Sequence, residues 1–508
     1  MCYVEASSLF EEGDLSRWPL FLFTTLSFLT RRDNFPMNIS FRPRLRSIAA
    51  LAVLAGPTPA MGAGPSLDGA GLSLLWCLPF AGVLLSLAIL PMVASHFWHR
   101  RQGLIALAWA LLFLVPFASV YGSSAAAHQL LDVALLEYIP FIVLIGSLYT
   151  IAGGIWLGGS LSGSPGQNTA IMAAGTGLAS LVGTTGAAMI FIRPLMRANR
   201  SRTHQAHLVI FFIFLVCNVG GALTPLGDPP LFLGYLKGVP FSWPFLHLWP
   251  HTLLLATILL GWFYVLDRRY YKTETPREHR LGGEGLKIWG IVNLPLIAAV
   301  VFAVAASGTT FIGPVDIAGV EVRGESLVRD AVLVVLAVLS LALTPLKARR
   351  QNEFNWAPVL EVAKLFAAIF VTIVPAIAIL KAGEHGAAAP LFAALGSADA
   401  PNHIAYFWLT GLLSSFLDNA PSYLVFFNAA GGDPVALAGP LASTLAAISA
   451  GAVFMGALTY IGNAPNFMVR AIAEHQGIKM PSFFGFMLWS VGFMIPPLLL
   501  VTALFFAG

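Results

Sequence analysis

Three long stretches of this chain contain no charged side chain. Asp, Glu, Lys and Arg are all absent from residues 138–192, 434–469 and 480–508. Because about 20 consecutive apolar residues are enough to cross a bilayer, these stretches predict membrane-spanning helices. Only 10% of the 508 residues are charged and 57% are hydrophobic, whereas a soluble domain carries about 25% charged residues. The deficit excludes a soluble enzyme, and no basic patch indicates a nucleic-acid partner.

Residues 1–64 follow a different pattern. Residues 1–36 are mixed in character and are interpreted as an over-extended start of the chain. Met37 then opens the layout of a signal peptide: three arginines at 42, 44 and 46, an apolar core at 47–56, and small residues at 57–64. We therefore predict that residues 37–64 are removed; the alternative is a short amphipathic N-terminal extension.

Ten apolar segments are predicted to span the membrane. They are 71–95, 103–121, 138–158, 205–223, 247–266, 288–306, 331–346, 361–380, 441–458 and 484–507. Two further segments, 168–199 and 403–429, are interrupted. Since short loops rich in Lys and Arg stay in the cytoplasm, the charge pattern is consistent only if the mature N-terminus lies outside. It also requires that 168–199 is a re-entrant hairpin entered from the cytoplasm and 403–429 one entered from outside.

The chain contains an internal repeat. Residues 221–230 read Gly-Ala-Leu-Thr-Pro-Leu-Gly-Asp-Pro-Pro and residues 456–465 read Gly-Ala-Leu-Thr-Tyr-Ile-Gly-Asn-Ala-Pro, an offset of 235. The predicted hairpin tips, 184–185 and 418–419, are offset by 234. The repeats open at Glu137 and Glu361 and have opposite orientations. The predicted organisation is N-terminal scaffold helices at 65–136, repeat 1 at 137–270 with a broken helix at 205–237, connecting loops and helices at 271–360, and repeat 2 at 361–508 with a broken helix at 441–475.

Each break is predicted to expose polar backbone groups at membrane depth. Prolines interrupt the helix, which can restart after an N-cap at Asp228 in one break and at Asn463 in the other. Corresponding breaks in inverted repeats indicate the midplane site of a transporter. Carbonyl and hydroxyl oxygens suit small cations, and helix N-termini suit anions. The candidate ion- or substrate-binding residues are Thr184, Thr185, Thr224, Gly227, Asp228, Asp418, Asn419, Thr459, Gly462 and Asn463.

Only two acidic residues lie deep in the apolar repeats, Asp228 and Asp418. A carboxylate at membrane depth is costly and marks an ion or proton pathway. The sodium-ligand candidates are these two aspartates together with Asn419 and Asn463. The alternatives remain open: Asp228 as an ordinary helix N-cap, Asp418 as a turn carboxylate at the wet end of a hairpin, and the threonines of the two breaks as helix-end hydroxyls.

The order of hairpin, broken helix, hairpin and broken helix resembles the ion-transporter superfamily. That superfamily includes sodium/proton antiporters, arsenite permeases, citrate transporters and sodium-coupled dicarboxylate transporters. Residues 417–421 (Leu-Asp-Asn-Ala-Pro) resemble the outward hairpin tip of the antiporter and arsenite permease branch. Residues 218–230 are similar to bacterial proteins called sodium/proton antiporters or putative citrate transporters. The resemblance covers about residues 70–508. It implies a homodimer with a static scaffold and a moving transport unit, an elevator motion. Together with the apolar segments and the charge pattern, it leads us to expect an all-α polytopic protein of the bacterial inner membrane, with about ten transmembrane helices and a periplasmic mature N-terminus.

Two transport functions compete. Two buried aspartates can alternate between sodium and protons, because burial favours the protonated carboxyl and a bound cation favours the charged one; this predicts a sodium/proton antiporter. The alternative is a sodium- or proton-coupled carrier of citrate or another carboxylate. The tips lack the Ser-Asn-Thr of the dicarboxylate branch, and no Lys or Arg lies within either break. An enzyme is not expected, because no HExxH or GxSxG motif occurs. No cofactor is predicted beyond the transported Na⁺ and H⁺.

Overall fold

The computed structural model describes residues 67–507 apart from 160–161, 275–286 and 398–399. All of these residues belong to one compact unit, residues 61–508. The predicted N-terminal extension (1–36) and signal peptide (37–64) lie outside the described residues.

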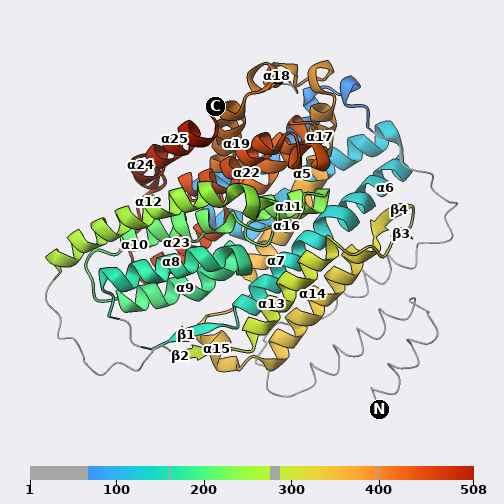
Figure 1. Cartoon of the computed structure of the whole chain (residues 1–508). Helices are drawn as coiled ribbons and strands as arrows, with labels where there is room; N and C mark the ends of the chain where they lie inside the picture. Colours follow the sequence, from blue (N-terminus) through green and yellow to red (C-terminus); the bar gives the residue numbers. More distant parts are fainter. Residues whose placement is uncertain (1–66, 160–161, 275–286, 398–399, 508) are drawn as a thin grey trace, which may run out of the picture. The chain divides into compact units, whose positions relative to one another are not determined.

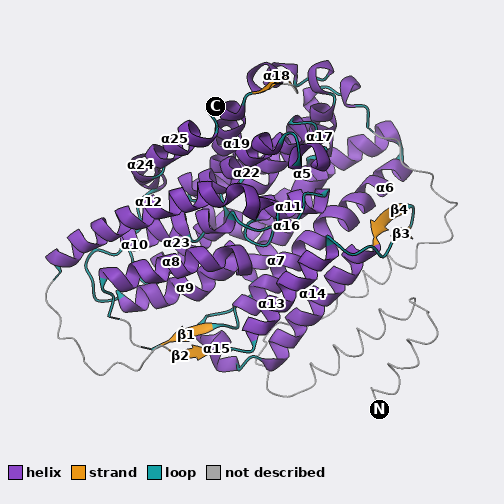
Figure 2. Cartoon of the chain, in the orientation of Figure 1, coloured by secondary structure: helices purple, strands orange, loops and turns teal. Residues whose placement is uncertain are grey.

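The described chain is mostly helical (Figures 1 and 2). The helices of its first half are α4 (Leu78–Val93), α5 (Ser95–Tyr121), α6 (Ser123–Val133), α7 (Ile139–Ala152), α8 (Pro165–Val182), α9 (Thr184–Ala198), α10 (Ala206–Leu215), α11 (Pro229–Lys237) and α12 (Trp243–Thr273). Those of the second half are α13 (Asn293–Ser307), α14 (Gly324–Leu343), α15 (Leu346–Gln351), α16 (Ala357–Thr372), α17 (Val374–Lys381), α18 (Ala389–Leu395), α19 (His403–Leu417), α20 (Asn419–Ala429), α21 (Pro434–Ala438), α22 (Ala442–Met455), α23 (Ala464–His475), α24 (Phe483–Phe493) and α25 (Ile495–Phe505).

Three short antiparallel strand pairs lie in the connections between helices. They are β1 (Trp156–Gly158) with β2 (Lys287–Trp289), β3 (Pro314–Ile317) with β4 (Val320–Arg323), and β5 (Gly396–Ser397) with β6 (Ala400–Pro401). The β1–β2 pair joins the segment after α7 to the segment before α13. The sequence pattern does not predict these strands, because such short strands leave no periodic signal.

Each of the ten predicted spans overlaps a helix or a helix pair. By length and composition, five described helices are able to cross a membrane, or seven if each of two bent pairs counts as one span. The bends, 41° between α16 and α17 and 43° between α24 and α25, come just before Pro375 and Pro496, where proline removes a backbone donor. Shorter apolar helices supply the remaining predicted spans.

Two predicted boundaries are wrong. The first span of repeat 1 does not open at Glu137, because a π-helical turn (Ala134–Tyr138) joins α6 to α7. The predicted end of the same span at 158 is also wrong. Helix α7 ends at Ala152 before the pair Gly153-Gly154, and the chain then enters β1. In repeat 2, α16 begins at Ala357, one turn before Glu361, with Pro358 in its first turn, a favoured position for proline.

The two interrupted segments are helical hairpins. Helices α8 and α9 lie side by side (Figure 1) and are separated by Gly183 alone, and α19 and α20 are separated by Asp418 alone. Gly183 has φ 77° and ψ 149°, and Asp418 has φ 81° and ψ 145°. These two residues are therefore equivalent at an offset of 235. The predicted tip offset of 234 is wrong, because the turn begins one residue earlier than the Thr184-Thr185 pair.

Both broken helices occur at the predicted positions. In the first, α10 is followed by a 3₁₀ turn (Val219–Gly221) and irregular chain before α11; in the second, α22 leads through a 3₁₀ turn (Gly456–Leu458) to α23. The two turns occupy nearly equivalent places in the sequence repeat. The breaks thus fold alike although their residues are only partly identical.

A buried ionic cluster holds the base of the first hairpin. The Asp267 carboxylate near the end of α12 accepts hydrogen bonds from Arg202 at 2.5 Å and Asn168 at 2.9 Å, and lies 2.8 Å from His207 Nε2. Asn199, which ends α9, accepts a further bond from Arg202. Because the charges neutralise each other away from water, the cluster ties α8, α9, α10 and α12 together.

Candidate functional site

The first broken helix brings Asp228 into the interior. Asp228 precedes α11, and its side chain is buried, with 1% of the residue exposed. The sequence predicts that it caps this helix. The position is right, but its carboxylate makes no capping hydrogen bond. Pro229 and Pro230 occupy the first two helical positions and have no N–H to donate, so the carboxylate accepts hydrogen bonds from other segments instead.

Three side chains from three other interrupted elements hold that carboxylate. Thr184 at the first hairpin tip donates to Oδ1 at 3.2 Å, and Asn463 of the second break donates to the same oxygen at 3.0 Å. Asn419 at the second hairpin tip donates to Oδ2 at 2.6 Å. All four residues are at most 2% exposed. The structure thus joins both hairpins and both breaks at one carboxylate.

These four residues are two repeat-related pairs. The repeat offset of 235 relates Thr184 to Asn419, and it also relates Asp228 to Asn463. Asn463, like Asp228, occupies an N-cap position without capping its helix. In both pairs the second half of the chain supplies an asparagine amide where the first half has a hydroxyl (Thr184) or a carboxylate (Asp228). Asp228 is therefore the one acidic residue among these four.

Two asparagines outside the predicted set of site residues, Asn218 and Asn466, extend the network. Asn463 Nδ2 also donates to the Cys217 carbonyl at 2.9 Å, and Asn218 Nδ2 donates to Asn466 Oδ1 at 2.8 Å. Asn466 in turn donates to the carbonyls of the second break. At an offset of 235, Asn218 corresponds to Val453 and Asn466 to Leu231. Neither asparagine has a polar counterpart in the other half, so the repeat does not indicate that they belong to the site.

Thr224 and Thr459 perform the same structural task in the two halves. Each hydroxyl donates to a hairpin carbonyl, Thr224 to Ser180 and Thr459 to Ser415. Each also accepts from the amide two positions later, at 3.1 and 3.2 Å. Both threonines therefore fasten a break to its hairpin, and neither contacts Asp228 directly among the hydrogen bonds of the described residues. Ser180 and Ser415 are not among the predicted site residues, although they too are related by the offset of 235.

Gly227 and Gly462 allow the backbone to fold tightly at the breaks. A Cβ on Gly227 would lie 2.1 Å from the Gly221 carbonyl oxygen, and one on Gly462 would lie 2.6 Å from that of Gly456. Gly227 also accepts a hydrogen bond from the backbone amide of Thr184 at 2.8 Å. Both glycines are predicted to bind the ion or substrate, but their role here is to shape the backbone, because only glycine permits such close approaches.

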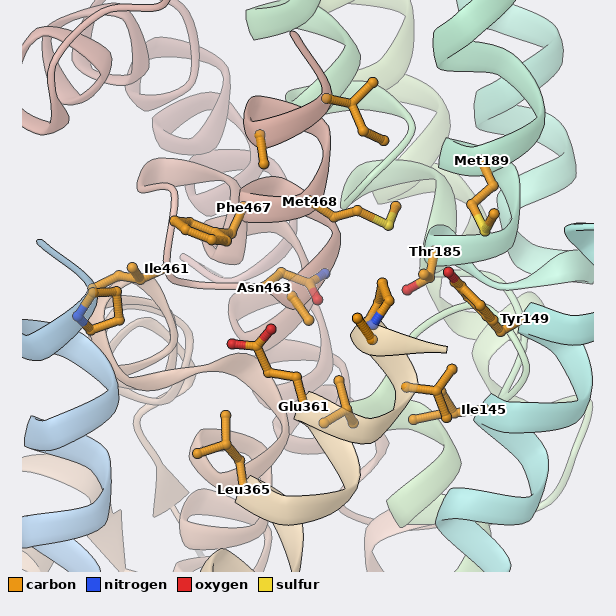
Figure 3. A pocket seen from close by; sticks show the side chains of 18 of the residues that line it. Ile145, Tyr149, Thr185, Met189, Glu361, Leu365, Ile461, Asn463, Phe467 and Met468 are labelled. Atoms are coloured by element: carbon orange, nitrogen blue, oxygen red, sulfur yellow. The ribbon is translucent and has the colours of Figure 1, made fainter. Parts of the chain in front are cut away.

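Asp418 and Thr185 face a larger cavity of about 490 Å³. Figure 3 shows Thr185, Tyr149 and Met189 on one side of this cavity and Asn463 on the other, with the Glu361 carboxylate turned toward Asn463. Asp418 is 7% exposed, and its side chain accepts from the Ala420 amide at 3.2 Å. Asp418 is thus both the cap of α20 and part of the cavity wall.

The surroundings of Asp228 suit a cation or a proton. Among the described residues, its hydrogen-bond donors are all neutral, and the Asp418 carboxylate adds a repulsive charge. Asn419 Oδ1 is buried without a hydrogen-bond partner in the described part of the chain, and amide oxygens are ligands that hard cations accept. A small cavity of about 40 Å³ adjoins Asp228, Thr184 and Thr185, enough for a water-sized particle.

Comparisons with known proteins point to transport. A family model described as "Putative citrate transport" matches residues 69–506, which agrees with the resemblance to citrate-transporter-like members of the ion-transporter superfamily. The chain is also 27% identical over 168 residues to the "Probable small intestine urate exporter" of Mus musculus. That alignment covers 33% of this chain and 31% of the relative, so it spans about a third of the relative's length.

Proposed function

Because this chain belongs to the family described as "Putative citrate transport", we propose that it carries a small carboxylate such as citrate, coupled to Na⁺ or H⁺. The protein is a multi-pass membrane protein, and its family and apolar helices agree with secondary transport. In this proposal the coupling ion binds at Asp228 and the carboxylate binds in the 490 Å³ cavity lined by Asp418 and Asn463.

One observation carries the coupling role: Asp228 is a buried carboxylate whose hydrogen-bond donors, among the described residues, are all neutral. A charge in this setting is costly unless a cation or a proton neutralises it. The four residues that meet there belong to elements that end or turn nearby. A small rearrangement of one hairpin therefore changes the ligand set, which links ion occupancy to conformation.

The finer features of the proposal concern movement. We propose that the two hairpins are re-entrant, that the repeats are inverted, and that the hairpins and broken helices move as an elevator against α4–α7, α13 and α14. The equivalence of the tips, breaks and threonine bonds in the two halves supports this assignment. A homodimer in the bacterial inner membrane with a periplasmic mature N-terminus remains part of the same proposal.

Sodium/proton antiport is the second candidate. Asp418, Glu353 and Glu361 all line the large cavity, and three carboxylates there favour cations over a free tri-anion. In that case the ion bound at Asp228 would itself be the cargo, exchanged for a proton.

A paired assay tests both candidates. Purified protein in proteoliposomes is expected to take up labelled citrate when an inward Na⁺ or H⁺ gradient is imposed. Uptake should fall to the background of empty liposomes in Asp228→Asn, because the neutral amide takes up no proton and lacks the negative charge that a bound cation would neutralise. In everted vesicles without citrate, dissipation of a pH gradient by Na⁺ would favour antiport. Citrate uptake that is equal in wild type and Asp228→Asn would refute the coupling role.

A further inference from the structure

We propose that Arg193 is the anion-binding residue of the 490 Å³ cavity and that Glu353 occupies this subsite when no substrate is bound. The inference rests on the proposed carboxylate transport and names the side chain that would recognise the cargo. The class of ligand is a small carboxylate, held by charge-assisted hydrogen bonds from a guanidinium.

One face of α9 leads from the hairpin tip to this arginine. Thr185, Met189 and Arg193 all line the cavity, and their i, i+4 spacing keeps them on the same side of a helix. At a rise of about 1.5 Å per residue, the Cα of Arg193 lies about 12 Å from that of Thr185 along the helix. An anion bound at Arg193 would therefore lie in the cavity that Asp418 also lines, but toward the C-terminal end of α9, away from the hairpin tip.

Arg193 has unused hydrogen-bonding capacity. Its side chain is 8% exposed, and it donates from Nη2 to Glu353 Oε2 at 3.2 Å. Nε and Nη1 are buried and have no hydrogen-bond partner among the described residues. A guanidinium binds a carboxylate best with two parallel N–H groups. A single bond to Glu353 leaves this guanidinium incompletely satisfied, and a better-placed carboxylate would complete it.

Glu353 is well suited to be displaced. Its side chain is 61% exposed, and it lies in the short connection between α15 and α16 with φ 49°. Exposed partners of this kind contribute little to an ion pair, because water solvates the carboxylate when it leaves. Glu353 therefore mimics a substrate carboxylate without holding the arginine firmly.

The buried pair of Arg202 and Asp267 shows what a structural ion pair looks like in this protein. Both side chains are at most 1% exposed, they are 2.5 Å apart, and the carboxylate has additional donors. Arg193 is nearly as buried but has only a solvent-exposed partner. Among the described residues that line the large cavity, it is the only Lys or Arg. The contrast assigns Arg193 to binding rather than to holding the fold.

Uptake kinetics of labelled citrate in proteoliposomes test the inference. Arg193→Gln should raise KM by at least about tenfold, as expected for loss of a charge-assisted bond, with Arg193→Lys in between. Glu353→Gln should lower KM, because the competing carboxylate is gone. Arg197→Gln is the matched control: this arginine is on the same helix but contacts Leu157 and Trp156, and KM should stay within about twofold of wild type.

The outcomes separate this inference from the proposed function. If wild type takes up citrate and Arg193→Gln keeps its KM, the anion subsite is wrong and carboxylate transport stands. If Glu353→Gln raises KM as Arg193→Gln does, the pair is structural and the inference is wrong. If wild type takes up no citrate under any gradient, both the inference and the proposed cargo are wrong. Thermal unfolding midpoints of the purified variants identify any that fail to fold.

Discussion

Replacing Asp418 with glycine should separate the structural role of this residue from its role in transport. Asp418 has φ 81° and ψ 145°, in a region of backbone conformation that is open mainly to glycine. Its repeat equivalent, Gly183, has nearly the same angles. The fold thus already accommodates glycine at this turn, and Asp418 keeps a side chain there against local strain.

The expected change in stability follows from three contributions. Relief of the strained backbone should stabilise Asp418→Gly by about 1–3 kcal/mol. The greater freedom of glycine in the unfolded chain should cost about 0.5–1 kcal/mol, and loss of the bond to the Ala420 amide a few tenths of a kcal/mol. The free energy of unfolding should therefore be unchanged or up to about 2 kcal/mol higher.

Two further variants calibrate this estimate. Asp418→Ala keeps the strain and loses the cap, so it should be less stable than wild type by about 0.5–2 kcal/mol. Gly183→Ala should be destabilised by about 1–3 kcal/mol through its backbone alone, because a Cβ there meets no atom closer than 3.4 Å. Thermal unfolding in detergent should give midpoints in the order glycine variant, wild type, alanine variant at position 418.

Transport is then measured on a variant that folds. Asp418→Gly removes a carboxylate from the wall of the large cavity without weakening the turn. We expect coupled uptake to fall while the unfolding midpoint is kept. A midpoint of Asp418→Gly below that of wild type would refute the argument from strain. Wild-type uptake by Asp418→Gly would show that the carboxylate has no part in transport and only caps α20.

Two other predictions concern hydrogen bonds, around the breaks and outside the spans. Thr224→Val and Thr459→Val should each lower the free energy of unfolding by about 1–3 kcal/mol, because each variant removes the hydroxyl that bonds both a hairpin carbonyl and a backbone amide of the break. Thermal unfolding midpoints should show the larger loss for the fully buried Thr459. If only one of the two variants is destabilised, the two threonines are not structurally equivalent. Outside the spans, burial would raise the pKa of Glu274, but hydrogen bonds from the Thr203 and His204 amides outweigh it and lower the pKa from its ordinary 4.5. The stability that Glu274 adds should be complete above its ordinary pKa and should be lost as the pH falls through its lowered pKa in the folded protein. The unfolding midpoints of wild type and Glu274→Gln should therefore converge in acid. A constant difference between the two midpoints across the titration would contradict this.

The internal repeat made much of the site predictable. The pairing of Asp228 with Asn463 and the convergence of tips and breaks follow from one offset in the sequence. The predicted tip register is nevertheless one residue out, because Gly183 and Asp418 share backbone angles and not side-chain chemistry. The offset of 235 that relates the two breaks also pairs Gly183 with Asp418, in agreement with their dihedral angles.

The sequence by itself determined the class of protein, the approximate limits of the apolar helices, and where those helices break. These features depend on local composition, on proline and glycine, and on the bilayer's demand for long apolar segments. The tertiary structure decided where the side chains at the breaks point. Asp228 could have capped its own helix, but it instead accepts hydrogen bonds from Thr184, Asn419 and Asn463. Arg193 belongs to neither break, yet the fold places it in the wall of the large cavity. A side chain takes the partners that packing brings within reach, and distant segments supply those partners only once the chain has folded.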